Sequence, residues 1–368
     1  MNICIDGYAA LNLPGTFISS YSEELIKDLT FSEHPHSMHV IFENDNYKKL
    51  LDKSSWCIPA NIELQRQKNN YDILERYLYE NGIEVYHSLN NGFSLPKNKC
   101  CSYVITVHSL YPVENKAKVD SKYYSKFLEV FPESIEKADK IIAVSGFIKD
   151  ELMRLFNINE NKIHVIYPVI SNIYKPLSFS QCKNYIYDKY HIKNEFIYYC
   201  GNIHTSKNIE RLIGLFKIVS SRCRDLKLVI TGDITGKKEE YYRELQNLSE
   251  KLDVKDRVIF TGLIPKEDTV YFYNRAKCVV SFSEYDGYPL SLSEAALCKT
   301  PIICLDNPSV KEILNNCAVT CSLSNANEIS EFIYYLSNNN QFRSNIINKM
   351  EAPLYSKAEE YLEFYSQI

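Results

Sequence analysis

The sequence predicts an α/β fold made of two doubly wound domains, each with a parallel sheet. Two observations lead to this prediction. Short apolar runs alternate with longer amphipathic runs along the chain, and the 368 residues exceed the usual size of a single domain. Such alternation is typical of parallel sheets covered by helices. Two domains of this kind are expected to face a cleft.

The first domain is expected over residues 1–170. Its strands and helices are predicted from the runs NICID (2–6), SYSEELIKDLTF (20–31), HVIFEN (39–44), SYVITVH (102–108), KIIAVS (140–145) and GFIKDELMRLF (146–156). The stretch 167–194 contains Pro168 and Pro176 and has no sustained period. We therefore expect a linker there.

The second domain is expected over residues 171–351. Its predicted strands are EFIYYCGN (195–202), LKLVITGD (226–233), RVIFTG (257–262), CVVSFS (278–283) and PIICLD (301–306), most of them separated by helical patterns such as those at 208–221 and 238–252. A C-terminal helix is expected within 352–368 and could pack back on the first domain. The face it would bury consists of Ala358, Tyr361, Leu362 and Tyr365.

The composition is that of an ordinary globular protein. Hydrophobic residues make up 45%, charged residues 24%, and the net charge is −4, so nucleic acid is not the expected partner. The chain starts without a secretory pattern and contains no run of about eighteen apolar residues. Twelve cysteines are scattered without a CxxC pair, which favours reduced thiols and a cytoplasmic location.

Several nucleotide and hydrolase motifs are missing. The eleven glycines form no GxG, and neither GxxxxGK[ST] nor GxSxG occurs, so dinucleotide, P-loop and serine-hydrolase chemistry lose their basis. No two aspartates stand two residues apart, and no divalent metal is expected at a diphosphate. The histidines of HPHSMH (34–39) lack acidic or cysteine partners at ligand spacing, which favours a turn over a metal site.

The segment EYDGYPLSLSEA (284–295) reads as a strand end, a glycine turn and a helix. If the helix begins just after Gly287 and Tyr288, the N–H groups around Leu290 and Ser291 are unpaired donors of its first turn and attract anions.

Two carboxylates flank this turn. Asp286 precedes it, and Glu294 lies about one helical turn inside the helix, so both could face one ligand and accept hydrogen bonds from sugar or ribose hydroxyls. The alternative is a helix-capping Asp286 and a solvated Glu294.

A second junction of strand, loop and helix is YYCGNIHTSKNIERLI (198–213). It places Gly201 at a strand end and opens a helix with Lys207 and Asn208, which adds a cation beside a positive helix terminus. A solvated Lys207 and a capping Asn208 are the alternatives. Together the two junctions match a nucleotide diphosphate-sugar better than either alone.

In the first domain, His108 ends a buried strand. A residue at this position can face the cleft. The alternative is a core histidine whose ring nitrogens are hydrogen-bonded within the protein.

With these segments and with KADKIIAVSGFIKDEL, KIHVIYPVI and the block at 258–303, the chain resembles family 4 retaining glycosyltransferases, a bacterial group that builds cell-surface polysaccharides. The resemblance covers nearly the whole chain. It implies the glycosyltransferase B fold, with two Rossmann-like domains. It also implies transfer of a hexosyl or N-acetylhexosaminyl group from a nucleotide diphosphate-sugar to a glycan or lipid-linked glycan hydroxyl. Anomeric configuration is kept, and neither metal nor cofactor takes part.

The resemblance also assigns roles. The family's E-x7-E motif matches Asp286 and Glu294. The resemblance implies that Asp286 contacts the hydroxyls of the donor sugar and that Glu294 contacts the ribose of the nucleotide. His108, Lys207 and Asp286 are the implied catalytic residues. The implied donor-binding residues are Gly15 in a phosphate loop, Asn202 and Lys207 at the phosphates, Gly262 and Leu263 beside the base, and Asp286, Gly287, Tyr288, Leu290, Ser291 and Glu294.

Three positions depart from the family pattern: Asp286 replaces glutamate, Asn202 replaces arginine, and Ser109 replaces aspartate. Because of these departures, a non-catalytic sugar-nucleotide-binding subunit stays an alternative, as does a sugar-nucleotide 2-epimerase. A lipid-linked acceptor would bring peripheral contact with the cytoplasmic face of the inner membrane.

Overall fold

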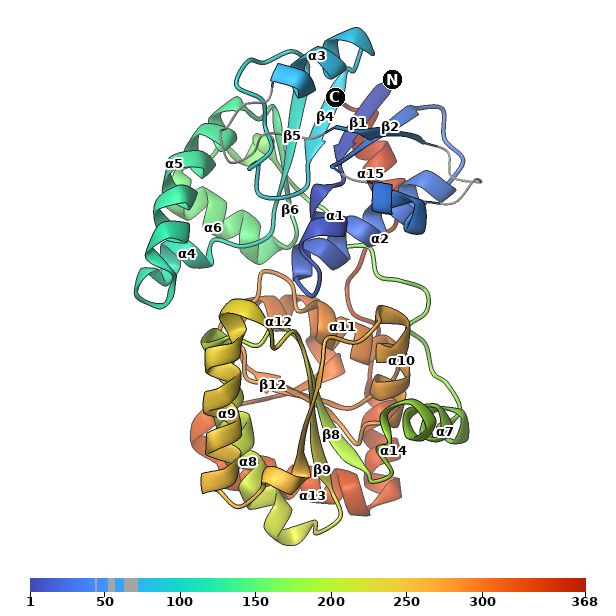
Figure 1. Ribbon diagram of the computed structural model, residues 1–368, viewed down its shortest axis with the longest axis vertical. Coiled ribbons are helices and arrows are strands. Elements are labelled where there is room, and N and C mark those ends of the chain that lie inside the picture. Colours follow the sequence, from blue (N-terminus) through green and yellow to red (C-terminus); the bar gives the residue numbers. More distant parts are fainter. Residues whose placement is uncertain (44, 52–56, 63–71) are drawn as a thin grey trace. The chain divides into compact units, whose positions relative to one another are not determined.

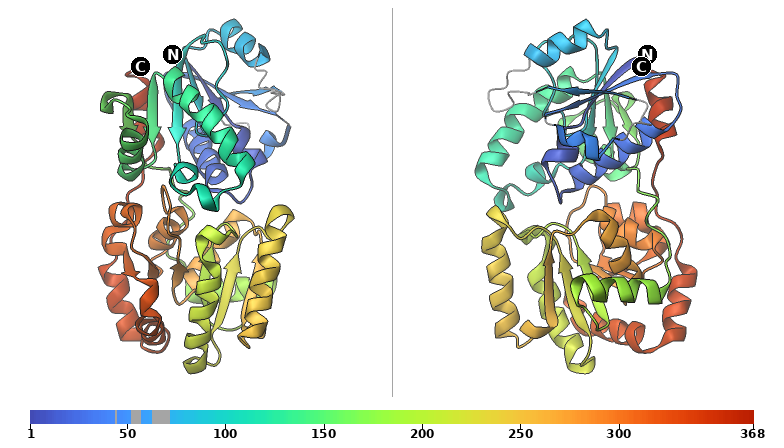
Figure 2. Two further views of the ribbon diagram at one scale, coloured as in Figure 1. Left: turned by 90° about the vertical axis from the view of Figure 1, so that its left-hand side faces the viewer. Right: turned by 45° about the vertical axis from the view of Figure 1, so that its right-hand side comes forward.

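The computed structural model describes residues 1–43, 45–51, 57–62 and 72–368. It divides the chain into two compact units, which are Met1–Ile170 with Tyr355–Ile368 and, as the second, Ser171–Leu354. Each unit has a parallel sheet with helices on both faces (Figure 1, Figure 2). The predicted fold class of two doubly wound α/β domains is confirmed.

The N-terminal sheet has seven strands in the order β3-β2-β1-β4-β5-β6-β7. Strand order reverses direction beside β1, as in doubly wound sheets. The strands are β1 (Asn2–Asp6), β2 (Ser37–Phe42), β3 (Ile58–Asn61), β4 (Val85–Ser88), β5 (Ser102–Val107), β6 (Lys140–Ala143) and β7 (Ile163–Val165). In the parallel register, Ile3 lies opposite Met38 on one side and Val85 on the other.

The helices of this unit are α1 (Tyr8–Asn12), α2 (Phe17–Phe31), α3 (Asp72–Glu80), α4 (Tyr111–Glu114), α5 (Ser121–Lys137), α6 (Gly146–Phe156) and α15 (Ala358–Tyr365). Three of them, α2, α5 and α6, begin at good capping residues. Thr16, Asp120 and Ser145 each accept a hydrogen bond from a first-turn amide.

Helix α15 returns from the end of the chain and packs on α2 of the N-terminal unit. Tyr361 Oη lies 3.0 Å from Tyr21 Oη, and Tyr365 Oη lies 2.6 Å from His87 Nδ1. Ala358, Tyr361 and Tyr365 are buried as the spacing predicted. Leu362 is half-buried, and Phe364 occupies the buried face as well.

The C-terminal sheet has six strands in the order β10-β9-β8-β11-β12-β13, all parallel. They are β8 (Phe196–Cys200), β9 (Lys227–Thr231), β10 (Val258–Gly262), β11 (Val279–Ser281), β12 (Ile302–Leu305) and β13 (Ala318–Cys321). Strands β8 and β11 are neighbours, so the strand order switches direction between them. Ligands of open α/β sheets bind outside the carboxyl ends of the strands at such a point.

The helices of the C-terminal unit are α7 (Phe179–Tyr190), α8 (Ile209–Arg222), α9 (Glu239–Lys251), α10 (Lys266–Arg275), α11 (Leu290–Leu297), α12 (Pro308–Leu314), α13 (Ala326–Asn338) and α14 (Asn340–Lys349). The buried side chains of α8, such as Leu212 and Phe216, pack with Ile197 of β8 and Leu228 of β9 in one hydrophobic core. That core anchors the strands whose carboxyl ends carry the candidate site.

The expected linker at 167–194 is partly wrong, because α7 occupies its second half. The helix is held by Asp268 of α10. Its carboxylate accepts a hydrogen bond of 2.6 Å from Tyr185 and lies 2.6 Å from the Lys189 ammonium. Tertiary contacts therefore stabilise a helix in which few residues are buried, chiefly Cys182 and Ile186.

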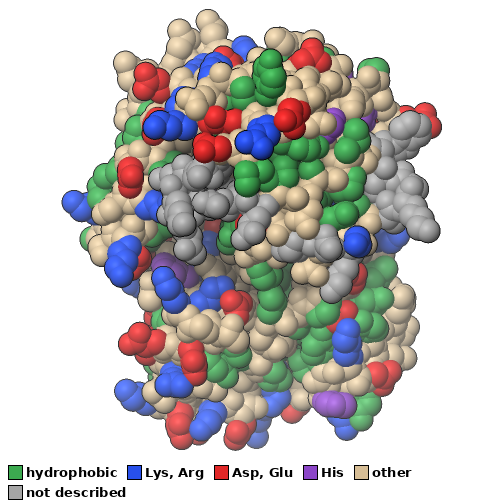
Figure 3. All heavy atoms as spheres, turned by 45° about the horizontal axis from the view of Figure 1, so that its top comes forward, with side chains coloured by type: hydrophobic (Ala, Val, Ile, Leu, Met, Phe, Trp, Pro, Cys, Tyr) green, Lys and Arg blue, Asp and Glu red, His purple; other side chains and the backbone are tan. Residues whose placement is uncertain are grey.

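Charged side chains of both signs are interspersed over the face drawn in Figure 3. This mixture agrees with the small net charge of −4. Among the described residues, no helix is both long and apolar enough to cross a membrane.

Candidate active site

The candidate site lies at the carboxyl ends of the neighbouring strands β8 and β11. One loop leads from β8 through a 3-10 turn, Thr205–Lys207, to α8, and the other leads from β11 to α11. Asn208 ties the loops together: its Nδ2 donates to the Phe282 carbonyl oxygen at 2.9 Å. Asn208 has a left-handed φ of 50° and makes no side-chain cap, so its role is to join the two loops.

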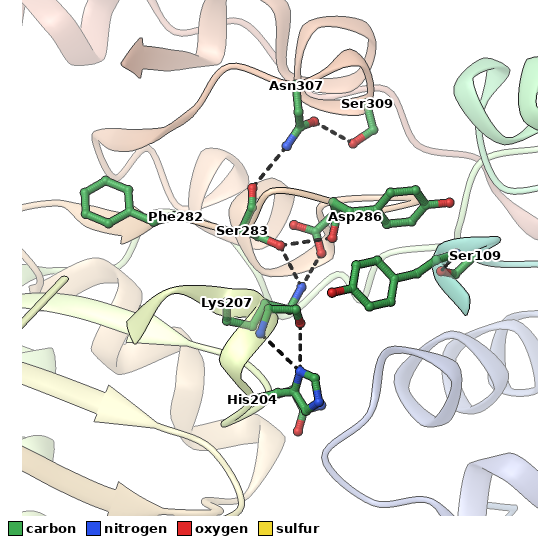
Figure 4. A network of polar contacts seen from close by, with 12 residues as sticks. Ser109, His204, Lys207, Phe282, Ser283, Asp286, Asn307 and Ser309 are labelled. Atoms are coloured by element: carbon green, nitrogen blue, oxygen red, sulfur yellow. Dashed lines mark hydrogen bonds and ion pairs between the residues drawn. The ribbon is translucent and has the colours of Figure 1, made fainter. Parts of the chain in front are cut away.

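Lys207 and Asp286, predicted to contact different parts of a ligand, form an ion pair with each other (Figure 4). The Lys207 ammonium also donates to Ser283 Oγ at 3.0 Å. Both charged side chains are about one-fifth exposed, at 22% and 20%. An ammonium carries three N–H donors, so two protein contacts leave Lys207 able to bind a further acceptor.

The loop after β11 is braced from a neighbouring helix. Asn307 Nδ2 donates to the Ser283 carbonyl oxygen at 3.4 Å (Figure 4). The Asn307 carboxamide oxygen in turn accepts from Ser309 Oγ and from the Val310 amide, both at 2.9 Å, at the start of α12. Ser283 Oγ also donates to the Tyr285 carbonyl oxygen at 3.0 Å. These bonds hold in place the hydroxyl that contacts Lys207.

Glu294 is a buried residue, 7% exposed, on α11. The solvated alternative is therefore wrong. Tyr273 of α10 donates a hydrogen bond of 2.7 Å to its Oε2. Burial, and then the Glu294 charge, raise the pKa of the Cys200 thiol to about 11. Because Cys200 is the last residue of β8, this carboxylate acts where the Lys207 loop begins.

Helix α11 begins at Leu290, directly after the turn, where the sequence predicted it. The Leu290 amide donates to the Tyr288 carbonyl oxygen at 3.0 Å, which contradicts the expectation of an unpaired donor and leaves Ser291 as the remaining candidate amide. Tyr288 is buried, and its hydroxyl donates to the Leu354 carbonyl oxygen at 2.7 Å. Its side chain therefore serves packing, and Gly287 beside it is buried as well.

Two further predicted positions lie at the same edge of the sheet. Asn202 accepts from Tyr199 through its backbone carbonyl oxygen at 2.8 Å, while its buried Oδ1 has no hydrogen-bond partner in the described part of the chain. Gly262 ends β10 with a φ of 71°, and Leu263 after it is 50% exposed. An exposed apolar side chain beside a glycine is compatible with the predicted contact to a base.

The remaining predicted residues belong to the N-terminal unit. Gly15 has a φ of 74° in the turn between α1 and α2. His108 is buried, its Nε2 lies 2.6 Å from the Leu89 carbonyl oxygen, and its ring stands edge-on to Tyr21. The carbonyl is an acceptor, so Nε2 carries the proton and Nδ1 is an acceptor. Burial lowers the pKa of His108 to about 4, which makes the ring neutral at pH 7.

Ser109, which stands where the family pattern has aspartate, accepts a hydrogen bond of 3.1 Å from the Tyr111 amide. It therefore contributes to a turn. Across the described residues, no group of three or more His, Cys, Asp or Glu side chains is arranged to hold a metal ion.

Sequence reasoning did not identify Ser283 or Tyr273 as partners of the site. Ser283 lies 76 residues from Lys207, and Tyr273 lies 21 residues from Glu294. The one usable signal was position, because Ser283 follows a predicted strand as site residues of α/β sheets do.

Two family models match successive parts of the chain. Residues 30–171 match the model described as Glycosyltransferase Family 4, and residues 188–352 match Glycosyl transferases group 1. The first covers most of the N-terminal unit, and the second covers most of the C-terminal unit with the Lys207 and Asp286 loops.

Curated relatives include two O-antigen enzymes. The O-antigen chain mannosyltransferase B of Escherichia coli is 27% identical over 253 residues, or 68% of this chain and 64% of that protein. The O-antigen chain mannosyltransferase RfbU of Salmonella typhimurium is 27% identical over 215 residues, or 58% of this chain and 55% of that protein. The chain thus spans less than two thirds of either relative.

Solved structures share the fold over the whole chain. The crystal structure of Anabaena HepE in complex with UDP has a TM-score of 0.73 at 14% identity and covers 100% of both chains. WaaG, a glycosyltransferase involved in lipopolysaccharide biosynthesis, has a TM-score of 0.70 at 14% identity and covers 99% of each. At identities this low, the matches show only that the fold is shared.

Proposed function

Because the chain belongs to the family 4 glycosyltransferases of the glycosyltransferase B fold, we propose that it transfers a sugar from a nucleotide diphosphate-sugar donor. The acceptor is a hydroxyl of a glycan or lipid-linked glycan, in the synthesis of a bacterial surface polysaccharide. One observation carries the proposal: Lys207, Asp286 and Glu294 all lie around the carboxyl end of β8. Mannose is the first sugar to test, because two relatives are named as mannosyltransferases.

In this proposal the Lys207 ammonium binds the donor diphosphate. Breaking the anomeric C–O bond builds negative charge on the leaving diphosphate, so a cation there stabilises the transition state more than the ground state. The Ser291 amide at the start of α11 adds a donor of the same kind. Protein donors supply this stabilisation, and the proposed reaction requires no metal.

Asp286 and Glu294 are proposed to orient the donor. The Asp286 carboxylate accepts from the sugar hydroxyls, and Glu294, held by Tyr273, accepts from the ribose. Aspartate is one methylene shorter than glutamate, and an error of about 1 Å in a positioning group can lower the rate on the order of 100-fold. To place its carboxylate where a glutamate would, the backbone of the loop bearing Asp286 must therefore lie closer to the donor.

The transfer is proposed to retain the anomeric configuration. The acceptor oxygen bonds to the anomeric carbon as the bond to the diphosphate breaks, and the acceptor proton passes to the departing phosphate oxygen. His108 is neutral at pH 7, with Nδ1 as an acceptor. It can orient a hydroxyl, and it has no proton on Nδ1 to donate.

The proposal is tested by incubating the purified protein with nucleotide diphosphate-sugars. The donors are mannose and glucose, each linked to uridine diphosphate or to guanosine diphosphate. We expect slow release of a nucleoside diphosphate without acceptor, faster release with a surface-glycan acceptor, and a product with the donor's anomeric configuration. An unreacted donor under all these conditions contradicts the proposed activity.

A second candidate, a non-catalytic sugar-nucleotide-binding subunit, is favoured by Asn202 and Asp286, where the family pattern has arginine and glutamate. It predicts tight donor binding without turnover even beside acceptors. A 2-epimerase would instead change the configuration at C2 of the donor sugar without needing an acceptor.

For a lipid-linked acceptor, the proposed location is the cytoplasmic face of the inner membrane. Co-sedimentation with anionic phospholipid vesicles tests this part separately from catalysis.

A further inference from the structure

We propose that Lys238 is a second cation for the donor diphosphate. This inference rests on the proposed function. A donor diphosphate carries two negative charges, and the loop after β8 offers the ammonium of Lys207, which is already paired with Asp286. Asn202, in the same loop, adds no charge. A further positive group from another strand would complete the site.

The loop after β9 lies directly against the loop after β8. Strand β9 pairs with β8 so that Thr231 lies opposite Cys200, and the Gly201 amide donates to the Thr231 carbonyl oxygen at 3.0 Å. A Cβ atom on Gly232 would lie 2.1 Å from the Gly201 carbonyl oxygen. Only glycine permits so close an approach, so the two loops leave the sheet side by side.

The β9 loop folds into a turn that directs Lys238. Asp233 Oδ1 accepts from the Thr235 amide at 3.0 Å and from its hydroxyl at 2.7 Å, while Oδ2 lies 2.9 Å from the Lys238 ammonium. Gly236 enters the turn with a φ of 60°. Lys238 is 23% exposed, so it is held at the loop rather than extended into solvent. Its environment parallels that of Lys207, another lysine paired with one aspartate.

Both ammonium groups act on one side chain of the β8 loop. His204 is fixed by Ser206, whose Oγ lies 2.9 Å from its Nδ1. Partial burial, and then the positive charges of Lys207 and Lys238, lower the pKa of the His204 imidazole. Both lysines therefore lie within electrostatic range of His204, at the edge of the sheet where the β8 and β9 loops leave it.

Helix energetics give no reason for a lysine at this position. Lys238 is the N-cap residue of α9 and makes no side-chain cap. The N-terminus of a helix carries partial positive charge, so a cation there is unfavourable, and aspartate, serine or asparagine would stabilise the helix better. A lysine at an N-cap is understandable if it serves an anionic ligand at the adjoining β8 loop.

Isothermal titration with uridine, guanosine and adenosine diphosphate tests the inference. Lys238→Met should weaken binding of the preferred diphosphate about 10- to 100-fold, the range for a lost charge-assisted contact. Lys237→Met is the matched control, because Lys237 is the exposed neighbour with the same charge, and it should change affinity less than twofold. Equal losses in both variants would show a general field effect and overturn the inference.

Two double variants separate a direct contact from a structural one. In the first, Asn202→Arg is added to Lys238→Met. It should raise the affinity at least tenfold above that of Lys238→Met alone, because it returns a cation to the adjoining loop. Asp233→Asn combined with Lys238→Met should stay weak. Full recovery in that double variant would mean that the freed Asp233 carboxylate caused the loss, and the inference would fail.

The outcomes also distinguish this inference from the proposed function. Wild-type protein that binds no nucleoside diphosphate contradicts the donor site itself. Wild-type protein that binds one, with unchanged affinity in Lys238→Met, contradicts the role of Lys238 alone.

Discussion

Each charged side chain of the candidate site is held by protein partners. Lys207 is bonded to Asp286 and Ser283, and Glu294 accepts from Tyr273. Under the proposed function, donor binding exchanges or extends these contacts. Their purpose is then to fix the direction of each charge before the donor arrives, since preorganised groups cost little reorganisation during the reaction.

Tyr273 tests this view, because its hydroxyl donates the hydrogen bond that holds Glu294. Tyr273→Phe should raise the KM for the donor about tenfold with a smaller change in kcat. It should also lower the free energy of unfolding by about 1.5–3 kcal/mol, the range for a hydrogen bond to a charged group. Tyr271→Phe, on the same helix, is the control. Donor kinetics that match those of the control would remove Tyr273 from the site.

Among the elements, the two site loops depend on Asn208. Its left-handed backbone starts α8, and its side chain reaches the end of β11 through Phe282. The conformation and the bond make separate contributions, and substitutions can separate them.

Asn208→Gly keeps the left-handed backbone and loses the bond, whereas Asn208→Ala loses both. Leaving the buried Phe282 carbonyl unpaired should cost about 1–3 kcal/mol, and alanine in the left-handed region should cost about 1–2 kcal/mol more. Urea unfolding should therefore rank wild type above Gly and Gly above Ala. An alanine variant as stable as the glycine variant would contradict this account.

Elements with a strong sequence pattern were predictable. Helix α6 occupies Gly146–Phe156, the predicted range, and strands β1, β5 and β8 lie within predicted runs. Strands β3, β4, β7 and β13 have three or four residues each and were not predicted, although β6, β11 and β12, which are as short, were. Helix α7 was missed because it depends on Asp268, which is distant in sequence.

The site was predictable where position alone determines it. Lys207 and Asp286 follow strands whose carboxyl ends meet at one edge of the sheet. The pairing of Lys207 with Asp286, the burial of Glu294 and the pairing of Lys238 with Asp233 depend on side-chain directions and on loop conformation. Hydrophobic periodicity carries no information on these contacts.

At the scale of the whole molecule, two buried histidines connect stability to pH. His87 lies between Tyr365 and Thr106, at 2.6 and 2.7 Å. Burial, followed by the charge of His108, lowers the pKa of His87 to about 3, and burial lowers that of His108 to about 4. Both rings stay neutral in the folded protein under conditions where the unfolded chain takes up protons.

The two neutral histidines contribute fully to the free energy of unfolding above about pH 6.5, the ordinary pKa of histidine. This contribution is lost as the pH falls toward 4. Each proton taken up by the unfolded chain lowers stability by up to about 1.4 kcal/mol per pH unit. The free energy of unfolding can be measured with urea at pH 7, 6 and 5. Its decrease with falling pH should be less steep in His108→Gln than in wild type, by the amount that corresponds to about one proton. Parallel pH curves for wild type and variant would show that His108 titrates normally in the fold.

The most direct test of the central claim is the rate of nucleoside diphosphate release by wild type, Lys207→Ala and Lys237→Ala, measured side by side with the accepted donor. A lost charge-assisted contact of about 1.5–3 kcal/mol predicts a turnover number about 10- to 100-fold lower in Lys207→Ala. Lys237→Ala should match wild type. A turnover number that is unaltered in Lys207→Ala would contradict the claim that this lysine stabilises the leaving diphosphate.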